Sequence, residues 1–291
     1  MDFAVLPVFL VVFAIQHAVE TGLLLLNLRH AARARGVPRP LAGRVDDATA
    51  ERSRAYTLAN GRFSLAQGAF LAALTLVALL SGILPALDGA LAARGIDGAH
   101  RFVLFLVLLG LGFSVATLPF SVFHTFVLEE RFGFNRTTPR LWLADRLKGL
   151  ALEAAIGIPF LYATYGFMRF AGALWWVWLF GFYVAVQLVL LWLYPSVIAP
   201  LFNRFQPLPA GPLRERLEAL ARAAGFAHRG LYVMDASRRS GHSNAYFTGI
   251  FRPRIVLIGA DNRIKDASYV EAAGPVRRPY RPPLSEPDPH P

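Results

Sequence analysis

The stretch FVLFLVLLGLGFSVATLPFSVF, residues 102–123, contains no charged side chain over its whole length. A helix needs about 20 consecutive, mainly apolar residues to cross the hydrocarbon core of a bilayer, so this stretch predicts a membrane-spanning helix. Four further stretches of the same kind lie before and after it: Phe3–Leu28, Phe63–Leu84, Leu150–Phe170 and Ala173–Ala199. We therefore expect an α-helical multi-pass membrane protein with about five transmembrane helices.

The composition of the whole chain supports this class. Hydrophobic residues make up 55% of the 291 positions, and the mean hydropathy is +0.43, which is more apolar surface than one soluble domain of this length buries. The first apolar stretch has no basic segment before it and is too long for the core of a signal peptide, so we interpret it as the first membrane helix. The absence of cysteine excludes a disulfide framework and any cysteine-ligated metal.

The net charge of +11 is unevenly distributed along the chain. Eight arginines lie between Arg29 and Arg62, and five more basic residues lie between His124 and Gly149, whereas the other connecting segments carry few. Because basic loops remain cytoplasmic, this alternation predicts that the N-terminus is outside and that everything after Ala199 is cytoplasmic. In a bacterium this would be the inner (plasma) membrane. No basic stripe is interleaved with aromatic residues, so we expect no nucleic-acid partner.

Four of the polar residues within the predicted spans are candidate site residues. Gln16, His17 and Glu20 are spaced so that they share one face of the first helix, and Glu153 begins the fourth. Such residues either form a structural hydrogen-bond network between helices or line a water-filled chamber. We treat these four residues as chamber-lining candidates, and we assign no metal to His17.

After Ala199 the sequence changes to that of a small cytoplasmic α+β segment. A helix is predicted from Pro212 to about Ala224, because leucines repeat at helical spacing and Gly225 can end it. Strands are predicted at 231–237, 244–251 and 254–259, and we expect them to form an antiparallel β-meander. The edge of such a sheet can bind an extended peptide by strand addition, although most edge strands are simply protected.

Four separated motifs resemble, in order and spacing, the type I CAAX prenyl proteases. They are RSRAYTLANGRFSL (52–65), HTFVLEERFGFNRTT (124–138), YPSVIAPLFNRFQPLPAGPLRERLEALA (194–221) and RRSGHSNAYFTGIFRPRIVLI (238–258). The resemblance implies an integral membrane zinc metalloendopeptidase, with a water-filled chamber, that cuts near the C-terminus of prenylated or membrane-associated proteins. It also implies a structural role for Glu129 and Glu130. By position, the strand that binds the substrate comprises Ser243, Asn244, Ala245, Tyr246 and Phe247.

The sequence departs from this family after Ile258. The family has an H-E-x-x-H helix there, in which two histidines bind zinc and the glutamate acts as general base. Here the only later histidine is His290. The resemblance therefore implies zinc in the complete family enzyme, but neither a metal ligand nor a catalytic residue in this chain. We expect the chain to be truncated by a frameshift or a misassembled gene end, and to be inactive by itself.

The last segment has an atypical composition. Between Gly274 and Pro291, seven of eighteen residues are proline, which predicts disorder. The expected organisation is a transmembrane N-terminal domain at 1–199, the start of a metallopeptidase domain at 200–259 and an atypical Pro/Arg-rich tail at 260–291. The alternative function is a non-catalytic membrane pseudoprotease that binds peptides by strand addition. In either case the expected partners are the lipid bilayer and peptides or C-terminal segments of membrane-associated proteins.

Overall fold

The computed structural model describes residues 5–34, 36, 37, 43, 45–235, 239, 244–248 and 254–259. These residues belong to two compact units, Met1–Gln187 and Leu188–Pro291. The boundary falls inside one long helix, α7 (Trp175–Leu193).

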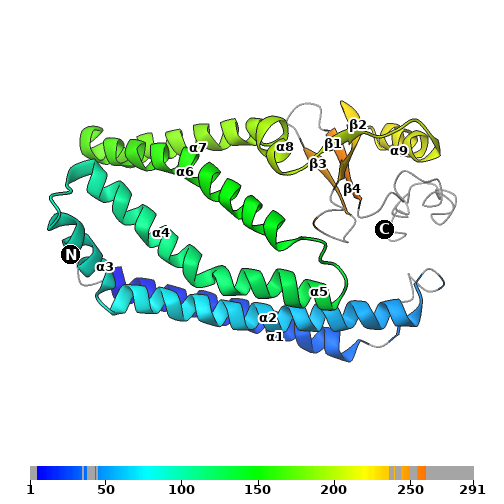
Figure 1. The fold of residues 1–291 in the computed structure, drawn as a ribbon, viewed down its shortest axis with the longest axis horizontal. Coiled ribbons are helices and arrows are strands. Elements are labelled where there is room, and N and C mark those ends of the chain that lie inside the picture. Colours follow the sequence, from blue (N-terminus) through cyan, green and yellow to red (C-terminus); the bar gives the residue numbers. More distant parts are fainter. Residues whose placement is uncertain are drawn as a thin grey trace, which may run out of the picture. The chain divides into compact units, whose positions relative to one another are not determined.

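All regular elements among the described residues of the first unit are helices (Figure 1). Helix α1 packs against α2, and α4 packs against α6, while the short helix α3 contacts both α2 and α4. The bounds in chain order are α1 (Val5–Arg33), α2 (Asp47–Leu80), α3 (Ile83–Ala92), α4 (Gly98–Phe123), the π-helix η2 (His124–Leu128), α5 (Glu129–Arg131), α6 (Pro139–Phe170) and the 3₁₀ turn η3 (Gly172–Leu174).

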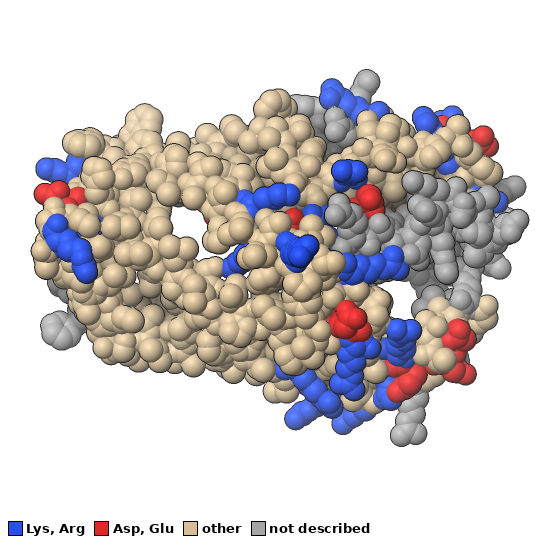
Figure 2. Space-filling view, viewed as in Figure 1, with Lys and Arg blue, Asp and Glu red and all other residues tan. Residues whose placement is uncertain are grey.

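The predicted number of spans is confirmed. Five helical segments of the described chain are long and apolar enough to cross a membrane: Val5–Arg33, Asp47–Leu80, Gly98–Arg131, Pro139–Phe170 and Gly172–Phe202. Hardly any residue in their most apolar windows is buried inside the protein. Figure 2 shows broad areas of this surface without Lys, Arg, Asp or Glu. Such an all-round apolar surface is suited to contact with lipid.

The second span differs most from its predicted bounds. Helix α2 begins at Asp47 rather than at Phe63. Asp46 caps this helix, because its carboxylate accepts a 2.6 Å hydrogen bond from the backbone N–H of Thr49. The polar residues that follow favour helix although they are too polar for the bilayer core. The helix ends at Leu80 because Gly82, at φ 79°, leaves the right-handed region. Residues 83 and 84 therefore belong to α3, which the sequence did not predict.

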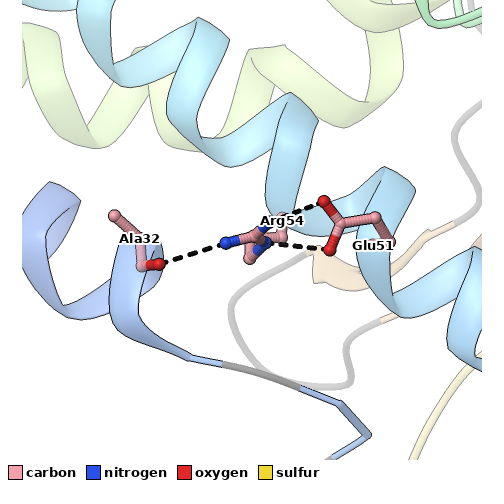
Figure 3. Close-up of polar contacts among 3 residues, drawn as sticks. All are labelled: Ala32, Glu51 and Arg54. Atoms are coloured by element: carbon pink, nitrogen blue, oxygen red, sulfur yellow. Dashed lines mark hydrogen bonds and ion pairs between the residues drawn. The ribbon is translucent and has the colours of Figure 1, made fainter.

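The corner between α1 and α2 is held by one arginine. The Arg54 side chain donates to both carboxylate oxygens of Glu51, at 3.0 and 2.6 Å, and to the backbone carbonyl of Ala32, at 3.0 Å (Figure 3). Carbonyls in the last turn of a helix have no partner within that helix. Arg54 thus provides one for α1 from the neighbouring helix.

The second unit contains the end of α7, a short helical segment, a sheet and one amphipathic helix. The elements that follow α7 are the π-helix η4 (Tyr194–Ile198), α8 (Ala199–Phe202), β1 (Phe205–Pro207), α9 (Pro212–Ala223), β2 (Gly230–Asp235), β3 (Asn244–Thr248) and β4 (Arg254–Gly259). The predicted helix from Pro212 is confirmed as α9. Strand β1 was not predicted, because three residues are too few for a periodic signal.

The strand order of the sheet is β1-β2-β4-β3, which differs from the predicted antiparallel meander. Strand β4 lies between β2 and β3, parallel to β2 and antiparallel to β3. The physical reason lies in the sequence of β4, where Ile255 and Val256 are 9% and 1% exposed although they point to opposite faces. A strand buried on both faces belongs in the middle of a sheet.

A small hydrophobic core joins the sheet to α9. Its most buried members are Leu208, Ala221, Leu231 and Ile255, and Leu213 and Leu217 of α9 pack against them. The described parts of the first and second predicted strands end at Asp235 and Thr248, and the predicted tail, 260–291, lies outside the described residues.

Candidate functional site

Strand β3 is the terminal strand on one side of the sheet. It pairs with β4 from Asn244, opposite Ile258, to Thr248, opposite Arg254. A terminal strand has one side on which a further extended chain can add by main-chain hydrogen bonds. Four of the five predicted substrate-binding residues, 244–247, lie on this strand, and Ser243 lies outside the described residues.

The side chains of β3 alternate between the two faces of the sheet. Phe247 lies on the face covered by α9, where its ring is 4.8 Å from that of Phe226 and its side chain stays 64% exposed. Tyr246 lies on the opposite face, and its hydroxyl donates to Sδ of Met234 at 3.9 Å. Burial raises the pKa of Tyr246, with a smaller contribution from Tyr194. The strand therefore has one anchored ring and one largely exposed ring.

A second group of contacts surrounds Glu129, which lies directly after η2. The Tyr56 hydroxyl on α2 donates to Oε1 of Glu129 at 2.6 Å, and Nε2 of His124 lies 3.8 Å from the same oxygen. The Glu129 side chain is 13% exposed. The carboxylate of the neighbouring Glu130 accepts a 2.9 Å hydrogen bond from the side-chain amide of Asn135. These contacts tie α2 to the segment after α4, as expected for a structural role.

The connection between α2 and the segment after α4 also includes backbone and ring contacts that the sequence did not reveal. Arg52 donates to the backbone carbonyl of Phe132 at 2.6 Å. The Tyr56 ring meets those of Phe132 and Phe134 edge-on, at 5.2 and 5.0 Å. The residues involved are 73 or more positions apart, and no local pattern connects them. Only the joint presence of the motifs at 52–65 and 124–138 could have indicated that these segments meet.

The four chamber-lining candidates lie on two different helix pairs. On α1, which packs against α2, the Gln16 amide donates to Glu20 at 3.0 Å, and the His17 ring stacks on Phe13 at 6.4 Å. On α6, which packs against α4, Glu153 lines a groove of about 220 Å³ together with small residues such as Gly157. In the described chain, no hydrogen bond, ion pair or ring contact joins the two sets, so a common chamber stays a prediction.

A zinc site of the kind that the resemblance implies for the complete family enzyme has no counterpart among the residues that the structure describes. In that part of the chain, no three His, Asp or Glu side chains come close enough together to hold a metal ion. Around His124, Glu129 is the acidic neighbour, and its carboxylate also accepts the Tyr56 hydroxyl. Three protein ligands are the minimum for a catalytic zinc, so these residues do not fit one.

Two family models match consecutive parts of the chain. Residues 27–204 match the model described as CAAX prenyl protease N-terminal, five membrane helices. Residues 207–260 match the model of peptidase family M48, and this range includes α9 and strands β2 to β4. The first match alone covers more than half of the chain.

This chain belongs to the CAAX prenyl protease family. It is therefore a multi-pass membrane protein of a metalloprotease family. The chain is 38% identical over 229 residues to the CAAX prenyl protease 1 homolog of Oryza sativa subsp. japonica, which covers 76% of this chain and 54% of the relative. The identity to CAAX prenyl protease 1 of Saccharomyces cerevisiae is 37% over 235 residues, covering 76% and 51%.

The same fold occurs in a solved structure. The crystal structure of S. mikatae Ste24p superposes with a TM-score of 0.75 at 32% identity, covering 85% of this chain and 59% of that chain. The human CAAX prenyl protease 1 homolog is 34% identical over 229 residues, covering 76% of this chain and 48% of the relative. The chain thus spans about half the length of the curated relatives it matches.

Proposed function

We propose that this chain provides the membrane bundle and the substrate-holding strand of a zinc metalloendopeptidase that acts on C-terminal segments of prenylated or membrane-associated proteins. The observation that carries the proposal is the position of β3 at the end of a sheet within the part matched by peptidase family M48. A protease commonly holds its substrate as an extended strand added to such an edge.

In this proposal, residues 243–247 bind the peptide. The backbone of β3 provides the main-chain pairing, while the largely exposed Phe247 ring offers apolar surface to a substrate side chain. Tyr246 is anchored by Met234 on the other face, and it keeps the strand in register. Main-chain pairing gives affinity, and alternate side chains give preference among sequences.

The membrane bundle has two proposed roles. Residues 1–199 anchor the protein in the bilayer with the N-terminus outside, which the basic loops support, and residues 200–259 begin the metallopeptidase domain on the cytoplasmic side. Gln16, His17, Glu20 and Glu153 line a hydrated chamber, because ionisable residues at membrane depth require water or a partner.

We infer that the 291-residue chain by itself holds a peptide without cutting it. Its sequence contains no H-E-x-x-H motif, and in the family that motif would supply two zinc ligands and the general base. The second candidate is a pseudoprotease that only binds. Sequencing the gene through codon 260 and beyond, in all three frames, distinguishes the two. A frame that continues into H-E-x-x-H favours the protease, and its absence favours the pseudoprotease.

Strand addition is tested with a fluorescent prenylated C-terminal peptide and analogues that are N-methylated at one amide each. The purified chain in detergent is titrated with each analogue, and fluorescence anisotropy reports binding. Because only every second amide of an added strand faces β3, methylation at alternate positions should abolish binding and methylation between them should not. Equal binding of all analogues would rule out strand addition.

The same samples test the inference about cleavage. After incubation with added zinc, mass spectrometry should find the parent peptide intact, and a matched incubation with a full-length yeast relative controls for peptide quality. Any shortened product made by the purified chain would show that it hydrolyses peptides by itself.

A further inference from the structure

A cavity of about 580 Å³ lies in the first unit, between the start of α4 and α6. It begins at the turn that joins α3 to α4 and continues along both helices. Its lining residues are Gly95, Ile96, Asp97, His100, Val103, Leu104, Val107, Ile158 and Tyr162. All of them lie within continuously described parts of the chain, 45–235.

The cavity is polar at one end only. Asp97 precedes the first residue of α4, but its carboxylate makes no capping hydrogen bond. His100 follows one turn later, and its ring meets that of Tyr162 edge-on at 5.7 Å. The nearby carboxylate of Asp88 on α3, by contrast, is neutralised by an ion pair with Arg101. Asp97 therefore places a negative charge on the cavity wall beside two polar rings.

The remaining wall is apolar. Val103, Leu104 and Val107 continue the face of α4 that begins with His100, since they follow at spacings of three, four and seven residues. Ile158 of α6 lies across from them. This face covers about 10 Å along the helix axis. The cavity thus has one polar end and a longer apolar wall, which suits an amphiphile with one charged end.

The charge of the wall selects the kind of amphiphile. No Lys or Arg is among the lining residues. The two nearest arginines in sequence are engaged elsewhere, Arg101 with Asp88 and Arg94 with the backbone carbonyl of Ala90. An anionic headgroup would meet a carboxylate without a cation, whereas a primary amine would be complementary.

We propose that this cavity binds one phospholipid with a primary-amine headgroup, such as phosphatidylethanolamine. The amine pairs with Asp97, His100 and Tyr162 contact the polar part of the headgroup, and an acyl chain lies along Val103, Val107 and Ile158. The position suits a lipid, because the third candidate span begins at Gly98 and polar rings favour the depth of the headgroups.

This lipid site is separate from the contacts around Glu129. Helix α4 runs from Gly98 to Phe123, so the polar end of the lipid site, at Asp97, lies about 40 Å along the helix from the end that precedes the Glu129 contacts. The lipid site is also independent of β3, which belongs to the other unit. Loss of peptide binding would therefore leave this proposal intact, and the reverse also holds.

The test uses the full chain in vesicles that contain trace photoactivatable phosphatidylethanolamine or phosphatidylglycerol, with the reactive group on the acyl chain. After irradiation, mass spectrometry of the digested protein maps the labelled segments. We expect phosphatidylethanolamine to label residues 95–107 and 158–162 above the other spans, about two- to fivefold more than phosphatidylglycerol does. Uniform labelling of all spans, or equal labelling by both lipids, would mean bulk lipid contact and overturn the proposal.

Two variants separate the headgroup from the acyl chain. Asp97→Asn keeps a residue suited to begin a helix and should reduce phosphatidylethanolamine labelling to the phosphatidylglycerol level. Asp47→Asn, an exposed carboxylate in the first turn of α2, is the matched control and should change nothing. Ile158→Trp fills the cavity and should reduce labelling by both lipids. Unchanged labelling in either cavity variant contradicts the site, and the labelling of the other spans reports whether each variant is folded.

Discussion

In the second unit, four buried side chains lie together between α9 and the sheet, and Val256 is buried on the opposite face of the sheet. In the first unit, the most buried side chains lie at the two ends of α4, with Leu91 and Val103 near its start and Leu128 and Phe132 beyond its end. Most of the length of the spans buries almost nothing. The difference follows from the solvent, because lipid gives no hydrophobic drive for helices to associate. The first unit therefore relies on contacts at the helix ends, and the second unit relies on an apolar core.

The largest loss of stability is expected from a substitution that creates a cavity in the apolar core of the second unit. Leu208 is 2% exposed and contacts the cluster under α9, so Leu208→Ala should destabilise the second unit by about 2–4 kcal/mol. Hydrogen exchange of the β2 and β4 amides, measured by mass spectrometry, should accelerate accordingly, while exchange in α4 stays the same.

Leu220→Ala is the matched control for Leu208→Ala. The same side chain on α9 is 53% exposed, so its truncation should cost no more than about 0.5 kcal/mol. Equal effects of the two variants would show that the cluster is not the stabilising core of this unit.

An intermediate effect is expected at the helix-end contacts of the first unit. Tyr56→Phe keeps the ring packing against Phe132 and Phe134 but removes the hydrogen bond to Glu129. Loss of a bond to a carboxylate that is 13% exposed should cost about 1–2 kcal/mol. Exchange should rise at the amides of Phe134 and Asn135, which donate to the Glu129 carbonyl.

The control for Tyr56→Phe is Tyr183→Phe on α7. There the hydroxyl accepts a hydrogen bond from Gln187 one turn away, on an exposed surface, so the expected change in exchange is much smaller. If both tyrosines behave alike, the ends of the helices do not carry the stability that we assign to them.

The smallest effect is expected at the surface of α9. The hydrogen bond from Arg214 holds the pKa of Glu218 below its ordinary value. A depressed pKa adds stability above the unfolded-state pKa, and that stability is lost as the pH falls through the folded-state pKa. In Arg214→Gln, thermal unfolding of the second unit should therefore depend less on pH between about pH 5 and pH 3.

A control for the acid range is Arg222→Gln, whose side chain acts on Glu218 through charge at a distance rather than through a hydrogen bond. Its acid dependence should stay close to that of the unchanged chain. A larger effect from Arg222→Gln than from Arg214→Gln would contradict the assignment of the hydrogen bond as the main cause.

The parts of the fold that could be predicted from the sequence are those that local patterns determine. The spans follow from runs of apolar residues, and α9 follows from leucines at helical spacing. The end of α2 could not be predicted, because Ile83 and Leu84 continue the apolar run beyond the turn at Gly82. The end of a helix is determined by backbone conformation, here the positive φ of Gly82, and a hydropathy pattern contains no information about φ.

Pairings between distant residues were the other part that could not be predicted. The strand order required β4 to insert between β2 and β3, and a continuous apolar run does not reveal its neighbours. Likewise, the Tyr56 and Glu129 side chains meet across 73 positions. In the candidate site, the strand was predicted at 244–251 from its residue pattern, and its substrate-binding role was predicted from the resemblance. Its place at the end of the sheet follows from a strand order that differs from the expected meander.

The π-helix η2 determines more than the route of its own backbone. The backbone N–H of Glu129 donates to the carbonyl of His124, five residues earlier, so one residue is added to the turn compared with an α-helix. Each residue of an α-helix turns the direction of the next side chain by about 100°. Deleting one residue between His124 and Leu128 would shorten the chain very little, but it would rotate Glu129 away from Tyr56. The number of residues in this stretch therefore determines the direction in which Glu129 points. An insertion or a deletion here would destabilise the contacts of Glu129 more than most substitutions would.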